Sequence, residues 1–175
     1  TGVDDNLADG NQLFRIDFAA TTSTDPGYAG LVPAGVLLSN TDDDSAGITV
    51  TPIDGDTAED GTAAHVAVVL TSEPVADVTV HFASNDATEG STTSTSATFT
   101  AANWNAPQII TVVGTNDNVA DGNQGYAIVF APTTSSDANY AGRVPANVAV
   151  LNIDNDSPGI TVSPISGDTT EFGDR

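Results

Sequence analysis

Short runs of alternating apolar and polar residues fill the chain, and no stretch has the 3.6-residue period of an amphipathic helix. In the run 78–84, for example, Val78, Val80 and Phe82 alternate with polar or small residues, as in a strand with one buried face. Segments rich in Gly, Pro, Asn, Asp and Ser, which favour turns, separate these runs. The pattern predicts an all-β protein.

Seven short strands are expected in the central part of the chain. Their predicted ranges are 47–52, 63–70, 78–84, 96–100, 108–114, 126–131 and 147–153. Strands of this length, separated by turn signals at this spacing, favour a two-sheet, immunoglobulin-like antiparallel β-sandwich over a barrel.

The sequence repeats itself at an offset of 112 residues. Residues 1–63 align without a gap on residues 113–175, and more than half of the aligned pairs are identical. The segment 5–12 returns as 117–124 with one change, from Leu7 to Val119. A fixed period of this kind indicates tandem repeats. We therefore interpret residues 1–45 as the C-terminal part of a preceding repeat, 46–157 as one complete repeat and 158–175 as the start of a following one.

A partial repeat would leave strand edges without partners, and such edges promote association. We therefore expect the sequence to be a window on a longer polypeptide or on a continuous fibre. The expected partners are neighbouring copies of the same repeat, joined in one chain or head to tail between chains.

The charge of the chain is strongly one-sided, with 24 acidic residues against three arginines and no lysine, a formal net charge of −21. This charge disfavours binding to nucleic acid and to anionic membranes, and favours binding to cations. The absence of cysteine excludes disulfides, thiolate catalysis and Cys-ligated zinc. No apolar run has the roughly 18 to 20 residues of a membrane span, so membrane insertion is not expected.

The acidic residues of the complete repeat gather at one end of the predicted sandwich. Because successive antiparallel strands reverse direction, alternate loops lie at the same end. We name the end that holds the 53–62, 85–95 and 115–125 loops and the segment after 153 the acidic end. Ten carboxylates fall there: Asp54, Asp56, Glu59, Asp60, Asp86, Glu89, Asp117, Asp121, Asp154 and Asp156. Only Glu73, Asp77 and Asp137 fall at the opposite end. Charges placed for solubility are instead dispersed.

This crowding of carboxylates predicts a bound cation. Two carboxylates about 5 Å apart repel by roughly 3 kcal/mol at an effective dielectric constant near 20, and Arg143 is the only arginine in the complete repeat. Ca²⁺ takes six to eight oxygen ligands in flexible geometry, whereas Mg²⁺ demands a tighter octahedron. Oxygen ligands alone also disfavour transition metals. The sequence therefore predicts Ca²⁺. The alternative is that these acids occupy solvated turns, where Asp and Asn are common.

The pattern of acids is not that of an EF-hand, because Ile165 stands where the bidentate glutamate should be in the loop that begins at Asp154. It resembles the Calx-β family. In that family an adjacent acid pair is followed by an acid four residues later and another three residues after that. Asp4-Asp5, Asp9 and Gln12 follow this spacing, as do Asn116-Asp117, Asp121 and Gln124.

The resemblance to Calx-β implies a set of Ca²⁺ ligands from three loops and an acidic exit segment. These residues are Asp4, Asp5, Asp9, Asp42, Asp43, Asp44, Glu59, Asp86, Asn116, Asp117, Asp121, Asp154, Asp156 and Glu171. Gln12, Gln124, Asn116 and Asn155 stand where the family has acids, which implies fewer or more weakly bound ions.

The repeat is also similar to modules of long bacterial cell-surface proteins and calcium-dependent adhesins. The resemblance implies a structural module, a spacer or filament segment stiffened by Ca²⁺, in an extracellular setting where millimolar Ca²⁺ fills weak sites. The alternative is a carbohydrate-binding adhesin module with Trp104 or Tyr140 at an accessible cleft. An enzyme is not expected, because no set of nucleophile, base and orienting group is visible. His65 and His81 are interpreted as sheet residues, and Trp104 as a lid on the core.

Overall fold

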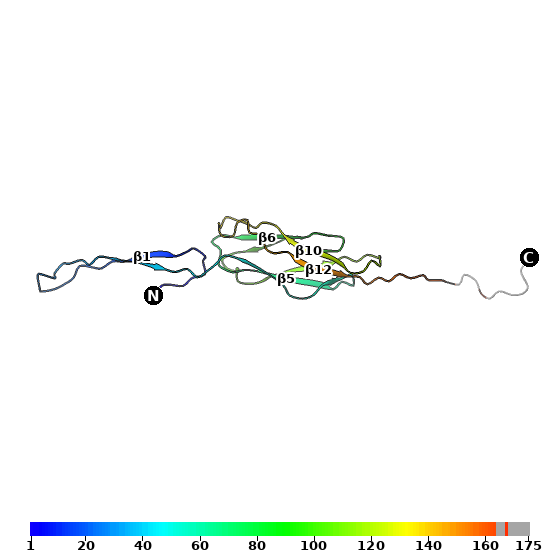
Figure 1. Ribbon diagram of the computed structural model, residues 1–175, viewed down its shortest axis with the longest axis horizontal. Helices are drawn as coiled ribbons and strands as arrows, with labels where there is room; N and C mark the ends of the chain where they lie inside the picture. Colours follow the sequence, from blue (N-terminus) through cyan, green and yellow to red (C-terminus); the bar gives the residue numbers. More distant parts are fainter. Residues whose placement is uncertain (164–166, 168–175) are drawn as a thin grey trace, which may run out of the picture.

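The alternating runs of the sequence form strands in the computed structural model, which describes residues 1–163 and residue 167 (Figure 1). Within these residues every regular element is a strand, so the prediction of an all-β protein is confirmed for them. They include no helix that is long and apolar enough to cross a membrane. The main body is a sandwich of two sheets, whose strands run from Ile48 to Ile153.

The first sheet of the sandwich carries the strand from which the chain leaves the body. Its strands pair in the order β4 (Thr57–Ala58), β12 (Val148–Ile153), β10 (Gln124–Phe130), β6 (Val78–Ser84) and β11 (Thr134–Ser135), and β8 (Ser96–Phe99) also pairs with β6. All of these pairs are antiparallel except β4 with β12, which is parallel.

The second sheet is wholly antiparallel and has four strands. Their order is β3 (Ile48–Pro52), β5 (Ala63–Leu70), β9 (Gln108–Gly114) and β7 (Gly90–Thr92). Together the two sheets contain all seven expected strands, with bounds shifted by no more than about two residues. Strands β4, β7 and β11 were not expected, because two or three residues are too few to show an alternating pattern.

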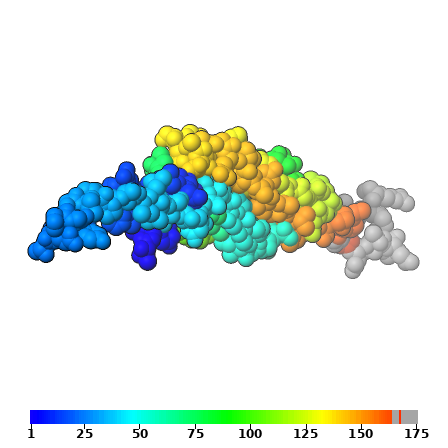
Figure 2. Space-filling view, turned by 60° about the vertical axis from the view of Figure 1, so that its left-hand side comes forward, coloured from blue at the N-terminus to red at the C-terminus, as the bar shows by residue number. Residues whose placement is uncertain are grey.

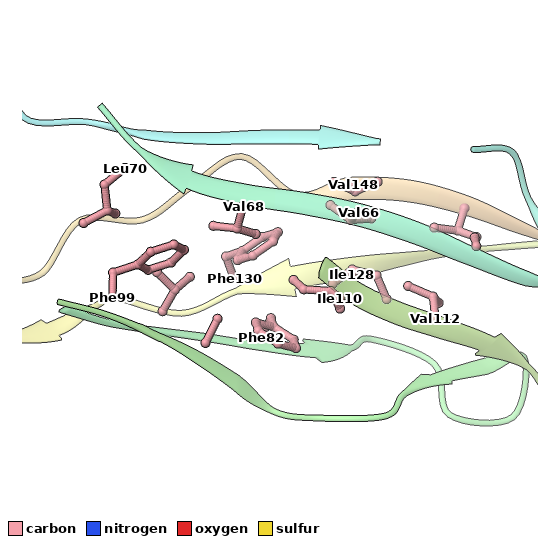
Figure 3. Packing of buried hydrophobic residues seen from close by; sticks show 14 of the residues in the cluster. Val66, Val68, Leu70, Phe82, Phe99, Ile110, Val112, Ile128, Phe130 and Val148 are labelled. Atoms are coloured by element: carbon pink, nitrogen blue, oxygen red, sulfur yellow. The ribbon is translucent and has the colours of Figure 1, made fainter. Parts of the chain in front are cut away.

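The core lies between the two sheets, whose inward side chains interdigitate (Figure 3). Strand β5 alternates strictly between buried and half-buried residues along its whole length, so that Val66 and Val68 point into the core. Phe82 and Phe130 meet at a ring-centroid distance of 6.0 Å with tilted planes. Trp104 packs against the edge of this cluster as a partly buried side chain, which confirms its interpretation as a lid.

The N-terminal residues 1–45 form a separate hairpin of strands β1 (Gln12–Ile16) and β2 (Val36–Asn40). Its register pairs Gln12 with Asn40, as that of the β10–β12 hairpin pairs Gln124 with Asn152. The two hairpins differ in burial, because Ile16 is 45% exposed whereas Ile128 is 0% exposed. No strand within the described residues covers the apolar face of the β1–β2 hairpin.

The molecule is elongated, with the hairpin at one end and the segment after β12 at the other (Figures 1 and 2). Residues 154–163 extend from the acidic end of the sandwich without forming a strand. The predicted start of a following repeat, 158–175, therefore lies largely outside the described residues.

The two hairpins provide a matched test of the fold. Ile128→Ala should lower the free energy of unfolding by about 2–5 kcal/mol, because it leaves a cavity in the core. Ile16→Ala, at the matching position of the exposed hairpin, should lower it by less than about 1 kcal/mol. Urea denaturation of both variants measures this difference. Equal losses would contradict the assignment of the core to the sandwich alone.

Candidate metal centre

A parallel strand pair brings the first acid of the acidic end into place. Strand β4 pairs with β12 so that Thr57 lies opposite Asn152 and Ala58 opposite Ile153. Directly after β4, the backbone N–H of Glu59 donates to the carbonyl of Ile153 at 3.1 Å. Glu59 therefore lies beside the segment that follows β12, although more than 90 residues separate the two along the chain.

A network of buried hydrogen bonds holds the paired strands β4 and β12 together. The hydroxyl of Thr57, which is fully buried, lies 2.9 Å from the Tyr126 hydroxyl and donates to the carbonyl of Leu151 at 3.0 Å. The side-chain amide of Asn152 donates to the carbonyl of Thr115 at 2.8 Å. A Cβ at Gly114 would collide with the Asn152 side chain and the Ala58 backbone. The base of the acidic end is thus closely packed and satisfied in its hydrogen bonds.

Above this base, three carboxylates converge without a basic partner. Glu59, Asp154 and Asp156 each place a carboxylate oxygen within 4.8 Å of those of the other two. Glu59 is only 9% exposed. One oxygen of Asp156, Oδ2, is buried and has no hydrogen-bond partner. Since an unpaired buried oxygen of this kind is costly, the group has the chemistry of a site for a hard cation.

Three other carboxylate oxygens of this group accept from backbone N–H donors. Asp154 accepts from the N–H groups of Asp156 and Gly122, each at 2.7 Å, and Glu59 accepts from the N–H of Asn155 at 3.3 Å. Gly122 has a φ of 79°, in the left-handed region that favours glycine. Asp154 therefore ties the 115–123 loop to the exit segment.

A second group of acids surrounds Glu89, just before β7. Burial raises the pKa of the Glu89 carboxyl above its ordinary value, and repulsion from Asp121, Asp86 and Asp117 raises it further, against a lowering contribution from the Asn152 side chain. In the same loop, hydrogen bonds from the hydroxyl and backbone N–H of Thr88 lower the pKa of Asp86. The charge of Asp86 is therefore satisfied within its own turn.

The same arrangement occurs once more in the N-terminal segment. A hollow is lined there by the acids Asp4, Asp5, Asp9, Asp42, Asp43 and Asp44, together with Gln12 and Asn40. Asp42 accepts from the N–H groups of Gly10 and Asp44, as Asp154 does from Gly122 and Asp156. Burial, followed by repulsion from Asp43, Asp42, Asp4 and Asp5, raises the pKa of Asp44.

In the part of the chain that the structure describes, no arginine neutralises the acids of the acidic end or those of the N-terminal hollow. Among the described residues the only ion pairs are Arg15 with Asp17, both exposed, and His65 with Asp54 at 2.6 Å. Hydrogen bonds from His65 lower the pKa of Asp54, which removes this acid from the group that needs a cation. Arg143 lies over the Tyr140 ring and donates to the Asn139 carbonyl.

The structure brings most of the predicted ligands into two groups, one at each copy of the motif. Asn116 lies beside the group of Glu59, Asp154 and Asp156, because its side-chain oxygen accepts from the Asn155 amide at 3.3 Å. Glu171 lies outside the described residues. Sequence reasoning placed Glu89 at the acidic end but chose Asp86 from that loop as the ligand. The signal that could have identified Glu89 is its place before Gly90, where a Cβ would collide with Tyr126, so that the backbone must run against the core.

Comparison with known proteins adds no assignment to this geometry. No protein-family model matches the chain, and no curated protein matches it. The chemistry of the site is therefore argued from its residues.

Repulsion at Glu89 predicts that removing its charge stabilises the metal-free protein. Glu89→Gln should raise the melting temperature in chelator at pH 7. Because burial and repulsion raise the folded-state pKa of Glu89, the penalty for its charge is absent below the ordinary pKa of 4.5, grows as the pH rises from there and is complete above the raised value. The gain should therefore vanish near pH 4. Asp77→Asn, an exposed acid at the opposite end, is the control and should change nothing. An equal gain at both pH values would contradict the repulsion.

Proposed function

We propose that this protein is a segment of tandem Calx-β-like repeats of 112 residues, a structural module that Ca²⁺ stiffens into an extracellular spacer or filament. The observation that carries the proposal is the group of Glu59, Asp154 and Asp156, which each place a carboxylate oxygen within 4.8 Å of the others and include a buried oxygen of Asp156 with no hydrogen-bond partner. A bound cation would satisfy that oxygen and remove the repulsion.

The ligand chemistry supports calcium over other ions. The side-chain oxygen of Asn116 lies beside the acids, and the surrounding loops carry further backbone carbonyls. Oxygen ligands on loops suit Ca²⁺, which takes six to eight oxygens in flexible geometry. Nitrogen and sulfur ligands, which transition metals prefer, are lacking at this end among the described residues; His65 is engaged by Asp54.

The segment that leaves the sandwich after β12 links ion binding to the stiffness of the joint between repeats. Residues 154–156 supply two carboxylates and are also the start of the chain that leaves the sandwich. Residues 42–44 have the same place between the hairpin and β3. Without an ion these segments repel the adjacent loops and move freely. With an ion, loops and segment share ligands, and the joint between successive repeats becomes stiff.

A stiff, elongated and acidic array suits reach and tensile strength, and the proposal includes no catalytic role. Weak oxygen sites fill only where Ca²⁺ is millimolar, which supports an extracellular location. For a carbohydrate-binding module, an accessible aromatic cleft is needed. Tyr140 is 1% exposed and Trp104 packs on the core, so neither supports that alternative.

Calcium should stabilise the full chain. At a Ca²⁺ concentration of 100 times Kd, one site adds about 2.7 kcal/mol, which raises the melting temperature by several degrees for a domain of this size. Asp121→Asn should weaken the calcium response, because the resemblance to Calx-β makes Asp121 an expected ligand and its charge acts on Glu89 at the acidic end. Thermal melts in Ca²⁺ and in chelator measure both effects.

The matched control is Asp77→Asn, which should keep the full calcium response. Asp137, another acid at the opposite end, is unsuitable as a control. It is 3% exposed and accepts from the N–H groups of Val75 and Asn139, so its replacement would disturb the fold. Identical melting curves in Ca²⁺ and in chelator would refute the proposed function. Mg²⁺ at the same concentration should give a smaller shift, since it dehydrates reluctantly.

A further inference from the structure

The loop that carries Asp5 and Asp9 of the N-terminal acidic hollow also contacts the sandwich. Leu7 forms a parallel β-bridge with Glu73, and the backbone N–H of Glu73 donates to the carbonyl of Asn6 at 2.7 Å. Two residues after Asn6, the carbonyl of Ala8 accepts from the side-chain amide of Asn139 at 2.8 Å. Two donors of the sandwich thus hold two alternate carbonyls of the preceding segment.

The surface that offers these donors is rigid. The Tyr140 hydroxyl donates to the Ser72 carbonyl at 2.7 Å and accepts from the Ser72 N–H at 3.1 Å. Asp137 accepts from the N–H groups of Val75 and Asn139 through its two oxygens. Glu73 and Asn139 therefore sit on a buried hydrogen-bond network that fixes where their donors point.

One strip of chain serves two purposes in this arrangement. Asp5 and Asp9 line the acidic hollow, while the carbonyls of Asn6 and Ala8, which lie between them in the chain, accept from the sandwich. An ion that fixes the carboxylates would therefore also fix the carbonyls that dock.

The second copy of this strip is exposed in the part of the chain that the structure describes. Residues Asn118–Ala120 repeat Asn6–Ala8, apart from Val119 in place of Leu7. Leu7 and Ala8 are half-buried against the sandwich, whereas Val119 is 57% exposed and Ala120 is exposed. The observed joint shows what fits this strip: a module that presents a backbone N–H as Glu73 does, and a side-chain amide as Asn139 does.

The amide is the variable part of this contact. The position of Asn139 in the repeat is occupied by Gly27 in the preceding copy, although the flanking Asp, Tyr-Ala-Gly pattern is the same in both. Glycine has no side chain to donate. A repeat with glycine at this position can offer the backbone donor but not the amide.

We propose that successive repeats join through this two-point clamp, and that the residue at the position of Asn139 decides which joints carry both points. The acidic loop of one repeat is the occupant, and the following repeat is the clamp. Joints with asparagine are held at two carbonyls and keep a fixed orientation. Joints with glycine are held at one and turn more freely. The inference deepens the proposed function, since it assumes that repeats follow one another in an array.

The test uses the full chain with Ca²⁺ present and follows hydrogen exchange at the backbone N–H of Glu73 by NMR. Asn139→Gly should speed exchange at Glu73 at least tenfold, because the strip loses its second anchor. Asn139→Asp, which keeps the shape but lacks the donor, should do the same or more. Gly27→Asn, the reverse change at the matching position of the hairpin, should leave exchange at Glu73 unchanged.

Unchanged exchange at Glu73 in both Asn139 variants would overturn the clamp, provided that their melting temperatures match the wild type. Different measurements test the clamp and the proposed function, so that either can be refuted while the other stands. Loss of the calcium response in the wild type would refute stiffening by Ca²⁺, while faster exchange in Asn139→Gly would still establish the clamp as a contact between repeats.

Discussion

Carboxylates that converge without a basic partner are the constraint on which the rest of this structure depends. Glu59, Asp154 and Asp156 meet above a closely packed base, and one oxygen of Asp156 is buried without a donor. Such an arrangement is unfavourable for the bare protein, because like charges repel and a buried acceptor loses its water. It becomes favourable when a cation supplies the missing interaction.

The two ends of the sandwich deal with polar groups in different ways. At the opposite end, Ser72 and Tyr140 hydrogen-bond to each other and Asp137 accepts from backbone N–H groups, so that these buried side chains are satisfied within the sandwich. At the acidic end, the network of Thr57, Tyr126 and Asn152 is satisfied, but one buried oxygen of Asp156 beside it has no hydrogen-bond partner. The opposite end can serve as a fixed platform, and the acidic end gains order from an ion. A repeat with one end of each kind is suited to head-to-tail joints.

Much of the fold could be predicted because its strands are long enough to show a period of two. The alternation in 78–84 and the β-branched run in 63–70 gave β6 and β5 with their bounds. The parity of the strands then placed the acids at one end. Strands β4, β7 and β11 escaped prediction because pairing, and not local pattern, defines them. For the same reason Glu89, although placed at the acidic end, was not chosen as a candidate ligand, since its surroundings depend on how β7 brings the chain against Tyr126. The joint at Glu73 and Asn139 could not be predicted either. Every residue has a backbone carbonyl, so the sequence does not show which carbonyls accept hydrogen bonds from the sandwich.

The most direct test of calcium stiffening is the distance distribution across the joint. The chain contains no cysteine, so spin labels can be placed at Thr24→Cys on the exposed tip of the hairpin segment and at Ser94→Cys on the exposed 93–95 turn of the sandwich. Pulsed electron resonance should then give one narrow distance distribution in Ca²⁺ and a broad one in chelator. Distributions of equal width in the two conditions would contradict the account.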